Sequence, residues 1–250
     1  MSKKTNKKAA KKDYEWIWLL TAAILVLAAV LLVVWLLAGR NSVNTTKPTA
    51  SQPSTTPVKI EGVDNVNIDI GSGMRIVDVA KYTGIYMEDG TNEVLSGLLM
   101  IVVKNEGTKD IQYAEVEMPV GDQTAYFKLS TLPAGESMVV LEKNRMAYTD
   151  GDYQTAISKN VAFFQAPLSL CKEKIVIQAL NGTINITNVS GADITGDVVI
   201  YYKNSASDML YGGVTYRCVI SGGLKKGEIK QISASHFTAN GSRVMFVTCG

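Results

Sequence analysis

The sequence is poor in the residues that most often carry chemistry. Its 250 residues include one histidine, three cysteines and six prolines. So few cysteines exclude a disulfide-dense small-domain scaffold, and no two of them have the short spacing of a zinc-binding pair. The one histidine, His236, has no neighbouring motif typical of a nucleophile and its base. We therefore expect no enzyme activity, no cofactor and no metal site.

Positive charge is scarce outside the N-terminus. From residue 41 onward the chain has 18 Lys and Arg against 21 Asp and Glu, whereas residues 1–15 carry a net charge of +4. A body without a positive excess has little to set against phosphates, which argues against nucleic-acid binding. The lysines of residues 1–15 predict a cytoplasmic segment beside a membrane span. Binding of anionic lipid or of nucleic acid is the alternative use of these lysines.

One long hydrophobic run separates this basic segment from the rest of the chain. Residues 16–39 contain no charged side chain. A helix of this length covers about 36 Å, enough to cross a hydrocarbon core of about 30 Å. A cleaved signal peptide has a shorter apolar core and an Ala-x-Ala-like cleavage site, so we predict a retained single-pass anchor instead. The lysines before the run place the N-terminus in the cytoplasm and the C-terminal part outside the cell membrane.

The remaining sequence predicts a linker followed by an all-β region. Residues 40–59 are expected to be a flexible linker, because eight residues between positions 41 and 59 are Ser or Thr and three are Pro. Beyond them, short β-branched or aromatic runs alternate with Gly-, Asn- and Asp-containing turns, and no helical period is sustained. We predict two tandem β-sandwich domains, over residues 60–168 and 172–250.

An internal repeat supports this division. Residues 101–111 read IVVKNEGTKDI and residues 184–194 read INITNVSGADI, which aligns Asn105 with Asn188. A second block, Leu-x-x-Gly-Glu, follows at residues 132–136 and again at 224–228. The second copy has nine additional residues between its aligned blocks. Two copies of about 80–90 residues indicate two domains of one fold.

These two blocks also carry a resemblance to a family. The pattern Asn-x-[Gly/Ser]-x-x-Asp-Ile, then a strand, then Leu-x-x-Gly-Glu, resembles small immunoglobulin-like modules on the surfaces of Gram-positive bacteria, such as the CARDB-like and FxLYD-like groups. The resemblance implies that the Asn ends one strand and that the Gly-Glu turn opens another on the opposite sheet. It also implies tethering and interaction rather than catalysis.

The predicted function follows from the anchor and the modules together. We expect a membrane-anchored binding or spacer protein that displays two immunoglobulin-like domains outside the cell. Its predicted partners are the lipid bilayer, through residues 16–39, and an unidentified surface protein or glycan. The alternative is an accessory single-pass subunit of an envelope or secretion complex, in which the membrane helix itself makes specific contacts.

A comparison of the two copies predicts an interaction surface in the second. An offset of 83 puts Val198 and Ile200 on an outer strand face where the first copy has glutamates, and the nine-residue insertion follows. Exposed apolar strands beside a loop that contains Tyr, Ser and Asn are typical of protein-binding sites. Two alternatives are that the first domain packs there, through Met100 and Val102, and that the strand register differs by one residue. The predicted residues are Val198, Ile200, Tyr202, Met209, Leu210 and Tyr211.

The three cysteines allow at most one internal bridge. In the sandwich prediction, the first strand of the second domain begins at the pole where its last strand ends. This places Cys171 near Cys249, and Cys218 on a strand further away. A Cys171–Cys249 disulfide would close a loop of about 80 residues. Three free thiols are the alternative.

Overall fold

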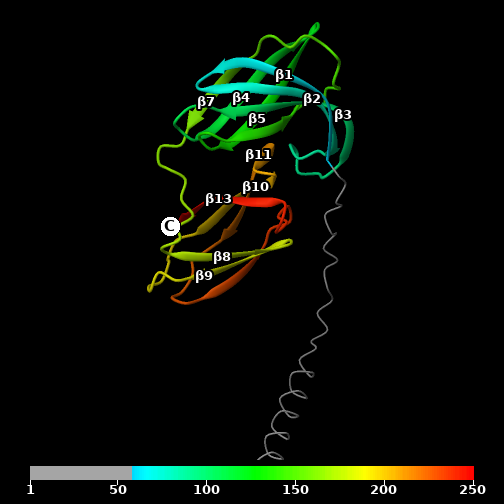
Figure 1. The fold of residues 1–250 in the computed structure, drawn as a ribbon. Coiled ribbons are helices and arrows are strands. Elements are labelled where there is room, and N and C mark those ends of the chain that lie inside the picture. The colour runs from blue at the N-terminus through cyan, green and yellow to red at the C-terminus, as the bar shows by residue number, and fades with distance from the viewer. Residues whose placement is uncertain (1–57) are drawn as a thin grey trace, which may run out of the picture. The chain divides into compact units, whose positions relative to one another are not determined.

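The computed structural model describes residues 58–250, which form thirteen β-strands joined by turns and loops (Figure 1). The all-β prediction is confirmed for these residues. The predicted cytoplasmic segment 1–15, the predicted span 16–39 and all but the last two residues of the predicted linker 40–59 lie outside the described residues. Within residues 58–250, no helix is long and apolar enough to cross a membrane.

Seven strands form one sheet that contains strands from both predicted domains. Its neighbours are antiparallel except for β6 and β11, which pair in parallel. Its strands, in spatial order, are β1 (Lys59–Gly71), β2 (Met74–Ile85), β3 (Val94–Asn105), β6 (Ser137–Leu141), β11 (Met209–Ile220), β10 (Val198–Ala206) and β13 (Ser242–Cys249).

Two three-stranded sheets pack against this large sheet. One has the order β5 (Gln123–Leu132), β4 (Ile111–Val120) and β7 (Ile157–Phe163). The other has the order β12 (Ile229–Ser233), β9 (Thr183–Asn188) and β8 (Ile175–Leu180). The first shares a core with β1, β2, β3 and β6, and the second shares a separate core with β10, β11 and β13. We call β1–β7 the first lobe and β8–β13 the second lobe.

The two lobes repeat one connectivity. In the first lobe β2-β3-β6 faces β5-β4-β7, and in the second β8-β9-β12 faces β11-β10-β13. The strands β2 to β7 of the first lobe therefore correspond, in chain order, to the strands β8 to β13 of the second lobe. Among the described strands, β1 alone has no counterpart in the second lobe.

The repeated motif builds the same hydrogen-bonded corner in each lobe. In the first lobe, Nδ2 of Asn105 donates to the Leu132 carbonyl (3.1 Å) and to the carbonyl four residues ahead (3.0 Å). In the second lobe, Nδ2 of Asn188 donates to the Leu224 carbonyl (3.0 Å) and again to the carbonyl four residues ahead (2.8 Å). Both asparagines are buried. These bonds therefore satisfy polar groups that water does not reach.

The corner also corrects one expectation drawn from the resemblance. The Gly-Glu turn opens β6 and β12, which lie in the same sheet as β3 and β9, not in the opposite one. The reason is local: the Asn105 N–H donates to the Glu136 carbonyl (2.9 Å), and the Gly135 N–H donates to the Asn105 carbonyl (2.8 Å). The turn thus returns directly onto the strand that the asparagine ends. Equivalent bonds join Asn188 to the turn before β12.

Candidate functional site

Three of the residues predicted to form an interaction surface lie in the core of the second lobe. Val198 and Ile200 are 0% exposed and Tyr202 is 2% exposed. The prediction that Val198 and Ile200 face outward is therefore wrong. The buried positions are 114, 116 and 118 in β4 but 198, 200 and 202 in β10, so the strands correspond at an offset of 84 instead of 83. A shift of one residue turns every side chain of a strand to the other face.

The nine-residue insertion lengthens the β10–β11 hairpin until it meets the first lobe. Leu210 is fully buried in the first lobe's core. Its neighbours Met209 and Tyr211 point to the other face of the large sheet, where they pack on a cluster that contains Met100 and Val102. Met209, Leu210 and Tyr211 thus contact this chain's own first lobe instead of solvent. Val198, Ile200 and Tyr202 instead follow the other alternative, a strand register that differs by one residue.

Strand β11 closes one side of the first lobe by lying between the edges of its two sheets. It pairs with β6 through Leu210↔Met138 and also lies against β5. The approach is so close that a Cβ atom on Gly213 would lie 1.7 Å from the Lys128 carbonyl oxygen. Only glycine fits at this position. The lengthened hairpin thus inserts Leu210 into the first lobe's core, and its Gly213 lets β11 pass close to the backbone of β5.

Two ionisable side chains, one fully buried and one half-buried, bind the backbone at this crossing, and sequence reasoning missed both. Lys203 on β10 is fully buried, and its Nζ donates to the carbonyls of Ser130 (3.0 Å) and Gly213 (3.1 Å). Glu88, in the β2–β3 loop, accepts from the N–H groups of Gly213 (2.9 Å) and Leu141 (3.0 Å). The N–H and the carbonyl of Gly213 are therefore bound by ionisable side chains from different lobes. A lysine after an apolar strand gives no signal of such a role.

The charges of this pair are strongly affected by their surroundings. Burial lowers the pKa of Lys203 to about 7, and the nearby Glu88 only partly opposes that shift. Burial also raises the pKa of Glu88, against the hydrogen bonds from Gly213 and Leu141. Because Lys203 is fully buried, the pair acts on the packing of the lobes rather than on a molecule from solvent.

His236 also belongs to the junction. Its ring stacks on Tyr216 at 4.5 Å between centroids, with an angle of 17° between the planes. The Tyr216 hydroxyl donates to the Met87 carbonyl in the first lobe (3.1 Å). The histidine thus extends a chain of contacts between the lobes.

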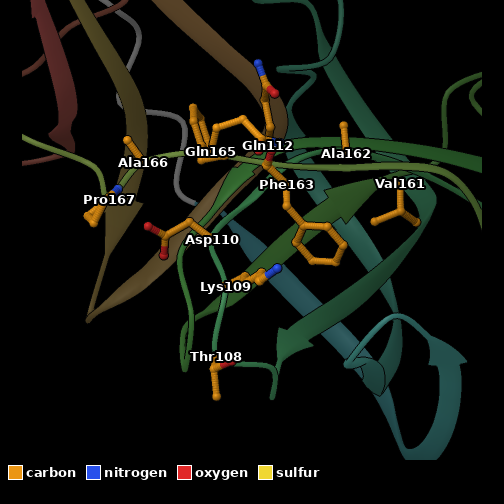
Figure 2. A pocket seen from close by; sticks show the side chains of 11 residues that line it. Thr108, Lys109, Asp110, Gln112, Val161, Ala162, Phe163, Gln165, Ala166 and Pro167 are labelled. Atoms are coloured by element: carbon orange, nitrogen blue, oxygen red, sulfur yellow. Dashed lines mark hydrogen bonds between the residues drawn. The ribbon is translucent and has the colours of Figure 1, made fainter.

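A hollow of about 650 Å³ lies where the first lobe leads into the segment that connects the lobes (Figure 2). Its lining consists of residues 108–110, Gln112 and 161–167. Figure 2 shows Lys109 beside the ring of Phe163, and Nζ is 6.0 Å from the ring centre. The Asp110 carboxylate accepts from the Ala134 N–H (3.0 Å). The charged groups of this hollow are therefore already engaged by their own lobe.

The second lobe has a more apolar groove, of about 530 Å³, on the side where β8 and β13 are the sheet edges. The outer edge of β8 has no strand neighbour among the described residues. On the corresponding side of the first lobe, β1 pairs with β2 and touches β7, where Ser158 Oγ donates to the Ile70 carbonyl (2.6 Å). The apolar side chains that line the groove are those of Leu170, Ile175, Val176, Ile177, Ala179, Phe237, Ala239 and Val244.

The three cysteines differ in burial. Cys171 and Cys249 are partly buried side chains on the core of the second lobe, and Cys218 is buried within it. All three thiols are free in this structure. Across residues 58–250, no group of three or more His, Cys, Asp or Glu side chains is arranged to hold a metal ion.

Comparisons with known proteins return no match. No protein-family model, no curated protein and no solved structure is similar to this chain. The geometry of the junction and of the groove therefore carries the functional argument.

Proposed function

We propose that this chain is a single-pass membrane protein that holds a stiff, two-lobed β unit outside the membrane to bind a surface partner. The basic residues 1–15, the apolar run 16–39 and the Ser/Thr/Pro linker support the membrane part of this proposal. The shared connectivity and the repeated asparagine corner support two immunoglobulin-like modules of the CARDB-like or FxLYD-like kind.

The observation that carries the proposal is the junction between the lobes. A hairpin of one lobe completes a sheet and a core of the other, and the buried Lys203 and the half-buried Glu88 both hydrogen-bond to the crossing strand. Two domains joined only by a flexible link would move independently. A unit joined in this way transmits position and force as one body, which suits a spacer or a display arm.

The proposed binding place is the β8 edge with its apolar groove. An edge strand offers unpaired N–H and C=O groups, and an extended peptide can add to it as a further strand. In the first lobe that position is filled by the extended strand β1. We therefore assign the site to an extended segment of a partner protein rather than to a glycan.

Protease digestion tests the membrane part. Protease added to intact cells is expected to remove the β lobes and to leave a short, lysine-rich membrane stub. Lobes that stay protected until the cells are lysed would overturn the topology.

Site-specific photo-crosslinking tests the binding part. A photoreactive residue at Gln178, exposed on β8, is expected to form a protein adduct in intact cells. The same residue at Tyr126, 42% exposed on β5, serves as the control. The additional substitution Val176→Lys should reduce the adduct at position 178, because lysine on an edge strand opposes strand addition. Equal adducts at both positions, or an adduct that Val176→Lys leaves unchanged, would argue against this site.

A further inference from the structure

Two cysteines from distant parts of the chain meet at one corner of the second lobe. Cys171 precedes β8, whereas Cys249 is the last residue of β13. The Cys171 Sγ lies 3.4 Å from the Val247 carbonyl, to which it donates, and the Val247 N–H donates to the Ser169 carbonyl (2.7 Å). The segment before β8 therefore runs along the outer edge of β13, and it brings Cys171 to the end of that strand.

The backbones on both sides of this contact are fixed by other interactions. Cys171 has a φ of 49°, its carbonyl accepts from the Lys174 and Ile175 N–H groups (2.8 and 2.9 Å), and its N–H donates to Ser169 Oγ (3.1 Å). Cys249 pairs with Val198 across the sheet. The position of the two thiols is thus set by the fold and does not depend on flexible ends.

The side chains complete the approach. Both pack on the core of the second lobe, and the Cys171 thiol contacts the carbonyl of Val247, two residues before Cys249. Burial and the contact with Cys171 raise the pKa of Cys249 to about 12. Cys218 is excluded as a partner of Cys249, because β10 separates β11 from β13 and strands two places apart lie about 9.6 Å from each other. That separation exceeds the Cα distance that a disulfide allows, about 7 Å.

We propose that Cys171 and Cys249 form a disulfide site that closes the second lobe covalently. The oxidant is a disulfide, either low-molecular-weight or on a thiol–disulfide oxidoreductase. The Cys171 thiolate attacks one sulfur of the oxidant and releases the first thiol, which leaves a mixed disulfide at Cys171. Cys249 then loses its proton and displaces the second thiol. The two cysteines lose two electrons and two protons in total, and the oxidant becomes two thiols.

The order of these steps follows from the thiolate being the nucleophile. Burial raises the pKa of Cys249, which lowers the fraction of Cys249 thiolate available for the first attack. The resulting bond joins the start of the lobe to its last strand. Closing a loop of about 80 residues should raise Tm by about 10 °C for a unit of this size.

The experiment uses the full-length chain in detergent, treated with oxidised glutathione and then analysed by intact mass and non-reducing peptide mapping. We expect a mass lower by two hydrogen atoms and one peptide pair that contains Cys171 and Cys249, in the wild type and in Cys218→Ser. In Cys249→Ser, glutathione should remain attached at Cys171. A bridge that contains Cys218, or two unreacted thiols in oxidised wild-type protein that remains folded, would overturn the proposal.

Alkylation of the wild-type protein tests the bridge without relying on variants, which could fail to fold. Alkylation of the untreated wild type, followed by mapping, reports which thiols react. After oxidation, Cys171 and Cys249 should both lose their alkylation together, while the labelling of Cys218 in the denatured protein stays complete. Loss of only one of the two labels would contradict the bridge.

Discussion

Each lobe contains six strands with the same connectivity, but the two lobes differ in what covers the sides of their sheets. In the first lobe, β1 covers one side and the start of β11 covers the other. In the second lobe, the side between β8 and β13 keeps an apolar groove and is crossed only by the segment around Ser169. The same fold thus serves as a fully enclosed support in one copy and as a partly open unit in the other.

The comparison shows what an insertion can do in a repeated fold. Nine additional residues lengthen one hairpin, and their side chains enter the core of the neighbouring lobe instead of forming a loop in solvent. The asparagine corner recurs in both lobes, where each buried asparagine donates to the carbonyl of the leucine in the second sequence block. Differences between the copies therefore concentrate at the junction and at the sheet edges.

The largest expected effect concerns the buried pair at the junction. Lys203→Met removes the donor of hydrogen bonds to the carbonyls of Ser130, Gly213 and Val214, and unpairing several buried acceptors at about 1–3 kcal/mol each makes a loss of about 3–5 kcal/mol. We expect a loss of that size in the free energy of unfolding, measured by denaturant titration of the full-length chain in detergent. Glu88→Gln combined with Lys203→Met should recover part of the loss, because no unpaired charge remains. A double variant as unstable as the sum of the two single ones would show that the groups act independently.

The same pair predicts a pH dependence. The folded-state pKa of Lys203 is lowered to about 7, whereas an unfolded lysine titrates near 10.4. Between these values the unfolded chain binds more protons, so the contribution of Lys203 to stability rises as the pH rises from about 7 to about 10. The difference in unfolding free energy between the wild type and Lys203→Met should follow this trend. A difference that is constant over the window would contradict the lowered pKa.

Next in size is the apolar wedge of β11. Leu210→Ala removes a fully buried side chain from the core of the first lobe, and such substitutions cost about 2–5 kcal/mol. Val219→Ala on the same strand is the matched control, because Val219 is 38% exposed and its loss should cost less than about 1 kcal/mol. Equal effects of the two substitutions in thermal or denaturant unfolding would show that the hairpin is not wedged into the first lobe.

A smaller effect is expected at the two asparagine corners, where the lobes can be compared directly. Asn105→Ala and Asn188→Ala each remove a buried side-chain amide that donates to several carbonyls, at a cost of about 1–3 kcal/mol. Asn188 also donates to the Lys225 carbonyl (3.0 Å) and accepts from Ser190 Oγ (2.7 Å), so its loss in unfolding free energy should be the larger of the two. A larger loss in Asn105→Ala would show that these additional bonds contribute nothing.

Sequence reasoning reached the strands and the repeat, because apolar alternation and the spacing of Asn, Asp, Leu and Gly-Glu are local signals. It could not fix the faces of β10, since an offset of 84 instead of 83 reverses them. It also could not find Lys203 and Glu88, because their burial depends on strands that meet across the junction. The groove beside β8 is equally non-local, since it arises from the lack of a counterpart to β1.

The smallest expected effect concerns the exposed rim of the junction, where an ion pair can be compared with the buried Lys203. Arg243 on β13 forms an ion pair with Glu136 of the first lobe, and both side chains remain about one third exposed. Exposed pairs contribute about 0–1 kcal/mol, and salt screens them. Arg243→Ala should therefore lower the free energy of unfolding by less than about 1 kcal/mol, and the difference should shrink as ionic strength is raised. Lys203→Met should keep most of its effect under the same conditions, because screening ions do not reach a fully buried group. A salt-insensitive loss at Arg243 as large as that at Lys203 would mean that the rim, too, is an enclosed part of the junction.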